Sequence, residues 1–353
     1  MKITVLLGGT SAERDVSIAS GLRVMTALRE RGHTVVGVDP ARGALCSEEE
    51  AQMRASGVQT APPSLEELRA LAGRPRDRGA AGLGDLPAVR GADVVFLALH
   101  GGQGEDGTIQ ALLDLLGVPY TGSGHMASAL AMDKDLSKLL FRAAGVPTAN
   151  WTMRRRIREG IVGGTAETDV ASLGLPIVVK PSKQGSTVGL TVVKKAEDLA
   201  GAVAEAFDYD DEVMLESFVA GREFTVGVLG DTALPVGEIL AVHEIYDYEC
   251  KYTAGMAKEV FPADLTAAQT ADVQALSLAA FRALKLDGYA RIDFRLGGDG
   301  VFYCLEANTL PGMTELSLIP QAAIAAGITF PELCERIVSL ARPEEAQVAE
   351  RLP

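Results

Sequence analysis

The stretch ARIDFRLGGDGVFYCLEANTLPGMTELS, residues 290 to 317, predicts two antiparallel strands joined by a GGDG turn. Alternate side chains of a strand share a face, so Arg291 and Asp293 point the same way while the residues between them face a core. Glu306 and Asn308 share one face of the second strand for the same reason. The hairpin therefore gathers two carboxylates and an amide.

This group of oxygen ligands suits a hard cation. Mg²⁺ prefers carboxylate, amide and water oxygens, and it commonly bridges the phosphates of a nucleotide. The alternative is an ordinary hairpin whose acidic face is only solvated. The remaining motifs of the chain bear on the choice between these two interpretations.

The composition is that of a globular enzyme with two or three domains. The chain has 353 residues, of which 47% are hydrophobic and 23% charged. A formal net charge of -14 argues against a nucleic acid or an anionic membrane as partner, because both need clustered Lys and Arg. Four cysteines without a CxxC pair fit reduced thiols and disfavour zinc. The apolar runs are too short for a signal peptide or a transmembrane helix, so we expect a cytoplasmic protein.

The first part of the chain alternates strands and helices. Residues 3 to 7 are expected to form a buried strand, residues 10 to 32 contain a helix, and the runs 34 to 39 and 92 to 100 supply further strands. This order predicts an α/β domain that is doubly wound around a parallel sheet. Residues 41 to 90 lack periodicity, so we expect a helical or loop insertion without chemistry there.

Two further domains are expected after this one. A helix over residues 132 to 145, a strand near residues 146 to 151, and a strand, glycine loop and strand over residues 177 to 195 predict a small α+β domain. Strands from residue 212 onward, a long helix over residues 266 to 286, the hairpin and a closing helix predict a third domain.

A glycine loop with a lysine beside it is a candidate phosphate site. In KPSKQGSTVG, residues 180 to 189, backbone N–H groups and hydroxyls can surround phosphate oxygens, and Lys180 adds a positive charge. The chain contains no GxxxxGK[ST] motif, which disfavours a P-loop NTPase. A flexible hairpin whose glycines only make the turn is the alternative.

Three other segments have both a structural and a functional interpretation. In residues 212 to 226, the strand-end Glu216 and the later Glu223 can serve a nucleoside or can simply be solvated. Glu13, three residues after a threonine, fits a helix capping box or a ligand contact. His100 begins the glycine loop HGGQGEDG at a strand's carboxyl end, where α/β sheets bind ligands, although a lone histidine is more often structural.

The polar segment YDYECKY, residues 246 to 252, has the character of a loop that closes over a site. Such a loop excludes water and brings a cation to a transferring phosphoryl group. Lys251 is the candidate cation, and Tyr252 is a candidate orienting hydroxyl.

Taken together, these motifs closely resemble the D-alanine–D-alanine ligases of the ATP-grasp superfamily. The matching segments keep the order of that family from residue 8 to residue 318: GGTSAERDVSIASG, ALHGGQGEDG, PYTGSG, MDKDLSK, KPSKQGSTVG, LESFVAGREFTV, YDYECKY, RIDF and LEANTLPGMTELSL. The resemblance implies an α/β and α+β architecture with an ATP-grasp fold. Residues 1–122 would form a Rossmann-like domain with the first D-alanine site, 123–215 a small central lid, and 216–353 the catalytic domain with the metal and second D-alanine sites.

The resemblance also implies a set of nucleotide and metal contacts. The residues on the ATP phosphates would be Lys134, Lys180, Thr187 and Lys251. Adenine would contact Glu216, Phe218 and Val219, and the ribose would contact Glu223. Two magnesium or manganese ions would be held by Asp293, Glu306 and Asn308.

The same family pattern implies contacts with both D-alanine molecules. Glu13 would bind the ammonium of the first, with Ser186 and Tyr252 hydrogen-bonded to it so that the YDYECKY loop latches shut, and His100 would support this site. Arg291 and the backbone N–H of Gly312 would flank the reacting carboxylate. Ser317 and Leu318 would receive the carboxylate of the second D-alanine.

The activity that the resemblance implies is the ATP-dependent joining of two D-alanine molecules through D-alanyl phosphate. The products would be D-alanyl-D-alanine for peptidoglycan precursors, ADP and phosphate, and the family suggests a homodimer. The alternatives are an ATP-grasp ligase with another amine or hydroxy acceptor, a binding-only paralogue, and a nucleotide-dependent dehydrogenase. The absence of GxGxxG and the two further domains disfavour the dehydrogenase.

Overall fold

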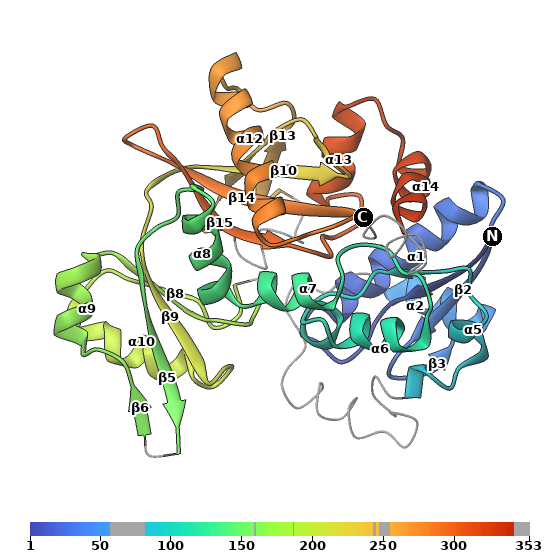
Figure 1. The fold of residues 1–353 in the computed structure, drawn as a ribbon, viewed down its shortest axis with the longest axis horizontal. Helices are drawn as coiled ribbons and strands as arrows, with labels where there is room; N and C mark the ends of the chain where they lie inside the picture. Colours follow the sequence, from blue (N-terminus) through green and yellow to red (C-terminus); the bar gives the residue numbers. More distant parts are fainter. Residues whose placement is uncertain (57–81, 159, 186, 243–244, 247–254, 342–353) are drawn as a thin grey trace, which may run out of the picture.

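The computed structural model describes residues 1–56, 82–158, 160–185, 187–242, 245–246 and 255–341. These residues form three sheets with helices packed on them (Figure 1). The predicted Ser186, Lys251 and Tyr252 contacts lie outside the described residues. None of the helices within the described ranges is long and apolar enough to cross a membrane.

The first sheet has a parallel centre, as the alternating pattern predicts. Its strand order is β3-β2-β1-β4, and β1 pairs in parallel with β2 and β4. The strands are β1 (Lys2–Leu6), β2 (Thr34–Asp39), β3 (Gly43–Ala44) and β4 (Val94–Leu97). The helices of this part are α1 (Arg14–Glu30), α2 (Ser47–Ser56), α5 (Pro87–Arg90), α6 (Thr108–Leu116) and α7 (His125–Met132). In the described part of residues 41 to 90 there is a short strand and two helices, which agrees with the expected insertion.

The beginning of α1 corrects one of the two interpretations of Glu13. A capping box would make Thr10 the N-cap and place Glu13 inside the first turn. Instead Glu13 is itself the N-cap residue, and its side chain makes no capping hydrogen bond. The capping interpretation is therefore wrong, because the helix starts three residues later than the box requires.

The second sheet is antiparallel and belongs to the expected small α+β segment. Its order is β6-β5-β9-β7-β8. The strands are β5 (Trp151–Ile157), β6 (Gly160–Val162), β7 (Ile177–Pro181), β8 (Thr191–Val193) and β9 (Glu212–Ser217). The helices packed on this sheet are α9 (Ala166–Leu173) and α10 (Leu199–Ala206), and a 3₁₀ turn at Ala196–Asp198 leads into α10. The helix expected over residues 132 to 145 is α8 (Lys134–Ala143), but its Phe141 is buried in the core of the third sheet. A further 3₁₀ turn, at Gly102–Gly104, follows β4. The strand expected near residues 146 to 151 begins only at Trp151.

The third sheet contains the predicted hairpin. Its order is β13-β12-β10-β14-β15, and β11 pairs with β10. The strands are β10 (Gly221–Leu229), β11 (Thr232–Ala233), β12 (Gly237–Ala241), β13 (Ala257–Val260), β14 (Tyr289–Gly297) and β15 (Phe302–Asn308). The helices are α12 (Ala267–Ala283), α13 (Leu318–Ala325) and α14 (Phe330–Leu340). The long helix expected over residues 266 to 286 is α12, and a capping box between Thr266 and Gln269 sets its start.

The alternation predicted for the hairpin is confirmed in β14, but a bulge interrupts it in β15. Asp293 pairs with Glu306 and Phe294 pairs with Cys304, so Leu305 is an extra residue, and Glu306 leaves the face on which Cys304 is buried. Ile292, Phe294 and Phe302 are fully buried in one core with α12, whereas the side chains at the alternate positions face the other side. The rings of Phe294 and Phe302 meet edge to face at 6.5 Å between centroids. This apolar face anchors the strands that carry the predicted metal ligands.

The C-terminal helices return to the first sheet. Ile319 of α13 and Ile337 of α14 share a core with Ile3 of β1 and Leu28 of α1. In Figure 1, α14 lies beside α1 although the two are separated by nearly the whole chain. The N-terminal and C-terminal parts are thus packed into a common core.

Truncation of Phe294 tests how strongly the hairpin is anchored. Phe294→Ala should lower the free energy of unfolding by about 3–5 kcal/mol, because it removes a fully buried ring. Urea denaturation followed by circular dichroism measures this difference. Leu115→Ala is the control, since Leu115 is 86% exposed and its loss should change stability by less than about 0.5 kcal/mol. Equal effects of the two substitutions would contradict the burial argument.

Candidate active site

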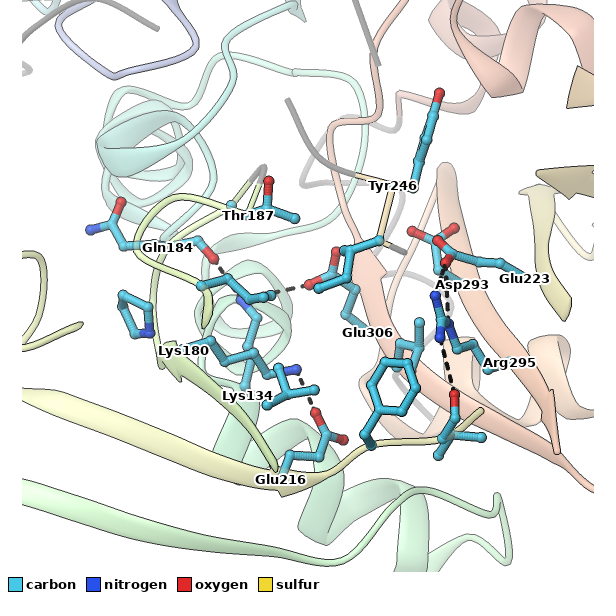
Figure 2. Close-up of a pocket in the computed structure, with 18 of the residues that line it drawn as sticks. Lys134, Lys180, Gln184, Thr187, Glu216, Glu223, Tyr246, Asp293, Arg295 and Glu306 are labelled. Carbon is cyan, nitrogen blue, oxygen red and sulfur yellow. Dashed lines mark hydrogen bonds and ion pairs between the residues drawn. The ribbon is translucent and has the colours of Figure 1, made fainter. Parts of the chain in front are cut away.

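A cleft lies between the second and the third sheet, and residues far apart in sequence line it (Figure 2). The space inside it is about 920 Å³ when the open mouth is counted. The lining comes from Lys134 of α8, from β7 and the loop after it, from the end of β9, and from β14 and β15. The cleft therefore joins the second sheet to the hairpin of β14 and β15.

The metal hairpin has the register that the sequence suggests. Asp293 pairs with Glu306, and Arg291 pairs with Asn308, so all four side chains lie on one face of β14 and β15. Thr225 donates to Asp293 Oδ1 at 2.7 Å, and the amide nitrogen of Asn308 donates to Asp293 Oδ2 at 2.9 Å. Asp293 and Glu306 both line the cleft.

The donor set of this face fits magnesium. Within the described ranges no three His, Cys, Asp or Glu side chains gather as a metal-binding group, so a site built wholly from such side chains is not formed. Two carboxylates and an amide oxygen instead suit a hard cation that completes its shell with water and phosphate oxygens. Asp293, Glu306 and Asn308 are the residues that would hold it.

Lysines face the hairpin from the opposite side of the cleft. Lys134 Nζ donates to the carbonyl of Gln184 at 2.7 Å and lies 3.6 Å from Glu306 Oε2. Burial lowers the pKa of Lys134, an effect that Glu306 partly offsets. Lys180 Nζ lies 2.6 Å from Glu216 Oε2, and the two form a buried ion pair (Figure 2). These ammonium groups are placed to meet phosphates.

The loop after β7 has a constrained backbone where it lines the cleft. Thr187 has a φ of 60°, which is uncommon for a residue other than glycine. Leu190 N–H donates to the Thr187 carbonyl at 3.1 Å, so the loop closes as a turn before β8. Such a turn presents N–H groups and the Thr187 hydroxyl together, which is the arrangement expected of a phosphate loop.

The other end of the cleft is suited to a nucleoside. Its apolar lining can enclose a flat ring, and the residues concerned are Val178, Leu190, Phe218, Val219 and Leu305. Arg295 crosses this end: its guanidinium donates to Glu223 at 3.1 Å and to the Val219 carbonyl at 3.1 Å, and it lies 5.1 Å from the Phe218 ring centroid. All three predicted adenine contacts and the predicted ribose contact line this cleft.

Glu13 and His100, the described residues among the predicted contacts of the first D-alanine, lie beside the cleft rather than in its lining. A Cβ on Gly185 would come within 2.9 Å of Glu13 Oε2, so the phosphate loop passes directly over this carboxylate. His100 Nδ1 lies 2.9 Å from the Leu310 carbonyl, and Ser20 Oγ lies 3.1 Å from His100 Nε2. Burial lowers the pKa of His100 and favours the neutral ring. His100 therefore ties the first sheet to the segment after β15.

Arg291 lies between the metal face and the predicted D-alanine sites. Its guanidinium binds Asp293 with two nitrogens, at 2.8 Å for Nη2 to Oδ2 and 3.0 Å for Nε to Oδ1. Burial would lower the pKa of Arg291, but Asp293 outweighs burial and raises it, so the side chain stays charged.

The predicted site of the second D-alanine is at the start of α13. Ser317 is the N-cap residue, and its Oγ accepts from the Thr314 N–H at 2.9 Å. The side chain of Leu318 is buried against Tyr246, so only its backbone N–H, at the first turn of the helix, can meet a carboxylate. A Cβ on Gly312 would come within 2.6 Å of Ser317 Oγ, which explains why this position is a glycine.

Sequence reasoning missed several residues of this region. Arg295 follows Arg291 and Asp293 at alternate positions, so the pleat of β14 could have indicated it. Lys138 follows Lys134 by one helical turn, so the helical period could have indicated that both lysines lie on one face of α8. Tyr246 and Gln184 line the cleft, but only the folded chain brings them there.

Of the described residues on which the metal, phosphate and nucleoside predictions fall, all but Asn308 line this one cleft, and Asn308 donates to Asp293 beside it. The family model described as D-ala D-ala ligase N-terminus matches residues 2–123, and the model described as D-ala D-ala ligase C-terminus matches residues 140–339. The chain belongs to the D-alanine–D-alanine ligase family. It is an ATP-grasp protein, as the resemblance implied.

Relatives of known function support this membership over the full length. The D-alanine–D-alanine ligase of Geobacter sulfurreducens is 43% identical over 341 residues, which cover 96% of this chain and 93% of that protein. The corresponding ligase of Geotalea uraniireducens is 41% identical over 340 residues, covering 96% and 95%. The crystal structure of the D-alanine–D-alanine ligase from Bacillus anthracis matches with a TM-score of 0.74 and 31% identity, and it covers 99% of both chains.

A second carboxylate lies close to Glu13. The Gly101 N–H donates to Glu105 Oε2 at 2.6 Å, which holds Glu105 in the glycine loop after β4. Burial, together with the negative charge of Glu13, raises the pKa of Glu105 to about 8. Burial and the charge of Glu13 therefore both favour the protonated form of Glu105.

The raised pKa of Glu105 predicts a pH dependence of stability. The folded state binds this proton up to about pH 8, whereas the unfolded chain releases it near pH 4.5, so stability should fall as pH rises between these values. Glu105→Gln should remove that contribution, and its unfolding free energy relative to wild type should increase from pH 5 to pH 8. The difference in unfolding free energy between the two proteins cannot change by more than about 1.4 kcal/mol per pH unit, because only one proton is involved. Urea denaturation at several pH values measures this difference. Plots of unfolding free energy against pH that run parallel for the two proteins would refute a raised pKa of Glu105.

Proposed function

We propose that this protein joins two D-alanine molecules to D-alanyl-D-alanine with consumption of ATP, as its relatives' names state for them. The observation that carries the proposal is the face formed by Asp293 and Glu306, which lies across one cleft from Lys134 and Lys180. Acidic metal ligands opposite lysines are the arrangement that phosphoryl transfer from a nucleotide needs. The dipeptide would serve peptidoglycan precursor synthesis.

The first step in this proposal activates a carboxylate. A carboxylate is a poor electrophile, so transfer of the γ-phosphoryl group from ATP would convert the first D-alanine into D-alanyl phosphate. Lys134, Lys180 and the Thr187 loop would hold the phosphates, and Lys251 would approach with its own loop. Two divalent ions at Asp293, Glu306 and Asn308 would supply charge neutralisation between the nucleotide and the substrate carboxylate.

The second step forms the peptide bond. The amine of the second D-alanine, bound through its carboxylate at Ser317 and Leu318, would attack the acyl phosphate and displace phosphate. Arg291 and the Gly312 N–H would stabilise the oxyanion of the tetrahedral intermediate, and loss of such a donor costs about 3 kcal/mol. Glu13, with Ser186 and Tyr252, would hold the ammonium of the first D-alanine, and His100 would support Glu13.

The parts of the fold have separate roles in this proposal. Residues 1–122 would bind the first D-alanine, residues 123–215 would cover the nucleotide, and residues 216–353 would hold the metal ions and the second D-alanine. The boundary at 215/216 falls within β9, whose last residue is Ser217. A homodimer is part of the proposal, and so is a cytoplasmic location, because the reaction consumes ATP.

A phosphate-release assay tests the function directly. The purified protein with ATP, Mg²⁺ and D-alanine should release phosphate, and mass spectrometry should detect the dipeptide D-alanyl-D-alanine. L-alanine is the matched control and should give little release. A mixture of D-alanine and D-lactate tests the alternative acceptor. No release with D-alanine, or an ester as the main product of the mixture, would reject the proposal.

Removal of one charge at the metal face should stop the reaction. Glu306→Gln keeps the size of the side chain but removes a negative charge beside the proposed ions, so kcat should fall by at least about 100-fold. The control is Glu332→Gln on α14, where Glu332 pairs with Arg336 at the surface and turnover should be unchanged. Thermal melting should show that both variants fold. Turnover of Glu306→Gln within twofold of wild type would contradict the assigned role.

A further inference from the structure

Helix α8 carries two lysines one turn apart, and the function proposed above uses only the first. Lys134 reaches the cleft, whereas Lys138 does not line it and its side chain is 0% exposed. A fully buried lysine is rare unless it is paired, because its charge must leave water. The partners of Lys138 therefore bear on what it does.

Lys138 has three partners beneath the cleft. Its Nζ forms an ion pair with Glu216 Oε1 and a hydrogen bond with Thr148 Oγ1, and it lies 5.3 Å from the centroid of the Trp151 ring. Thr148 in turn donates to the Cys304 carbonyl at 2.8 Å, two residues before the metal-face residue Glu306. Lys138 thus connects the floor of the nucleoside end to the strand that carries the metal face.

Glu216 receives one lysine on each carboxylate oxygen. Lys138 is at Oε1, and Lys180 is at Oε2 at 2.6 Å, so the carboxylate is held from two sides. Burial opposes ionisation of Glu216, but Lys138 and then Lys180 outweigh burial and lower the pKa of the carboxyl. The side chain is consequently an ionised group that can only accept hydrogen bonds, and each oxygen has a second lone pair to offer.

An acceptor of this kind distinguishes purines by the group at position 6. Adenine carries an amino donor there, whereas hypoxanthine and guanine carry a carbonyl oxygen that a carboxylate repels. Glu216 lines the cleft next to Phe218 and the apolar walls that suit a flat ring. With Lys138 absent, Lys180 would be the remaining cation on Glu216 among the described residues, and it would draw the carboxylate away from the ring.

We propose that Lys138 is a positioning residue that orients ionised Glu216 toward the purine 6-amino group and so sets the preference for ATP over 6-oxo purine nucleotides. The inference rests on the proposed function only in that the cleft binds ATP. By sharing Glu216, Lys138 also leaves Lys180 free to turn toward phosphate oxygens. A lysine that only fastened α8 to β9 would have no effect on nucleotide choice.

The test compares ATP with ITP, which differ in the group at position 6 of the base. Titration calorimetry with Mg²⁺ and the full chain gives the Kd ratio of ITP to ATP without any need for D-alanine. Lys138→Met, which is similar in length but uncharged, should lower this ratio about tenfold, mainly through weaker ATP binding. Lys138→Arg keeps the charge and should retain most of the preference.

A matched control separates positioning from general loosening of the fold. Arg154 is also a buried cation of the second sheet, ion-paired with Asp169, but it does not line the cleft. Arg154→Met should lower the melting temperature and leave the ITP to ATP ratio unchanged. A fall in the ratio as large as that of Lys138→Met would overturn the proposal.

A double-variant cycle tests whether Lys138 acts through Glu216. Glu216→Gln should itself lower the ratio, and the addition of Lys138→Met should lower it no further. If Lys138→Met alone does not fold, the pair still tests the role, because a ratio in the pair below that of Glu216→Gln would show an action of Lys138 that does not pass through Glu216. Additive effects, or an unchanged ratio in Lys138→Met, would refute the role.

The two proposals can fail separately. If the wild-type protein prefers ATP to ITP but releases no phosphate with D-alanine, the ligase function is rejected. The double-variant cycle would still decide the role of Lys138, because it measures nucleotide binding alone. A wild-type protein that makes the dipeptide, with a Lys138→Met variant of unchanged nucleotide preference, would reject only the role of Lys138.

Discussion

The pairing of β14 with β15 is the constraint on which the rest of the site depends. It places Asp293 opposite Glu306 and Arg291 opposite Asn308, while Phe294 and Phe302 on the other face are buried against α12. A shift of register by one residue would turn the carboxylates into the core and the aromatic rings into the cleft. The same packing that stabilises the sheet therefore holds the acidic face in position.

Charge compensation links this face to α8 and to the second sheet. Lys134 approaches Glu306, and Lys180 and Lys138 hold Glu216, so buried cations and carboxylates alternate along the floor of the cleft. A charged group is costly to bury alone, and here the lysines hold Glu216 in its ionised form while Glu216 raises the pKa of Lys180. The lysines of α8 and β7 thus have a structural role at the places where a nucleotide phosphate and a purine would bind.

The first sheet contributes to the site through the C-terminal part of the chain. His100 bonds to the Leu310 carbonyl, and Ser20 accepts from the Met313 N–H at 3.0 Å, so the loops of the first sheet and the segment after β15 form one structure. Shared core packing of α1, α13 and α14 supports this junction. Glu13 and Glu105 lie here, which is where the family pattern places the first D-alanine.

The sequence by itself determined the hairpin, the positions of most strands and helices, and the residue types of the metal and phosphate groups. These are local properties: the two-residue period of a strand fixes which side chains of β14 share a face, and Gly and Thr set the shape of the loop after β7. Tertiary structure alone decided that Glu13 occupies the N-cap position of α1 without a capping hydrogen bond, and that burial and the nearby Glu13 raise the pKa of Glu105. It also decided that Arg295 and Lys138 hold Glu223 and Glu216. Those outcomes depend on distances between segments that are dozens to hundreds of residues apart, and no local periodicity encodes such distances.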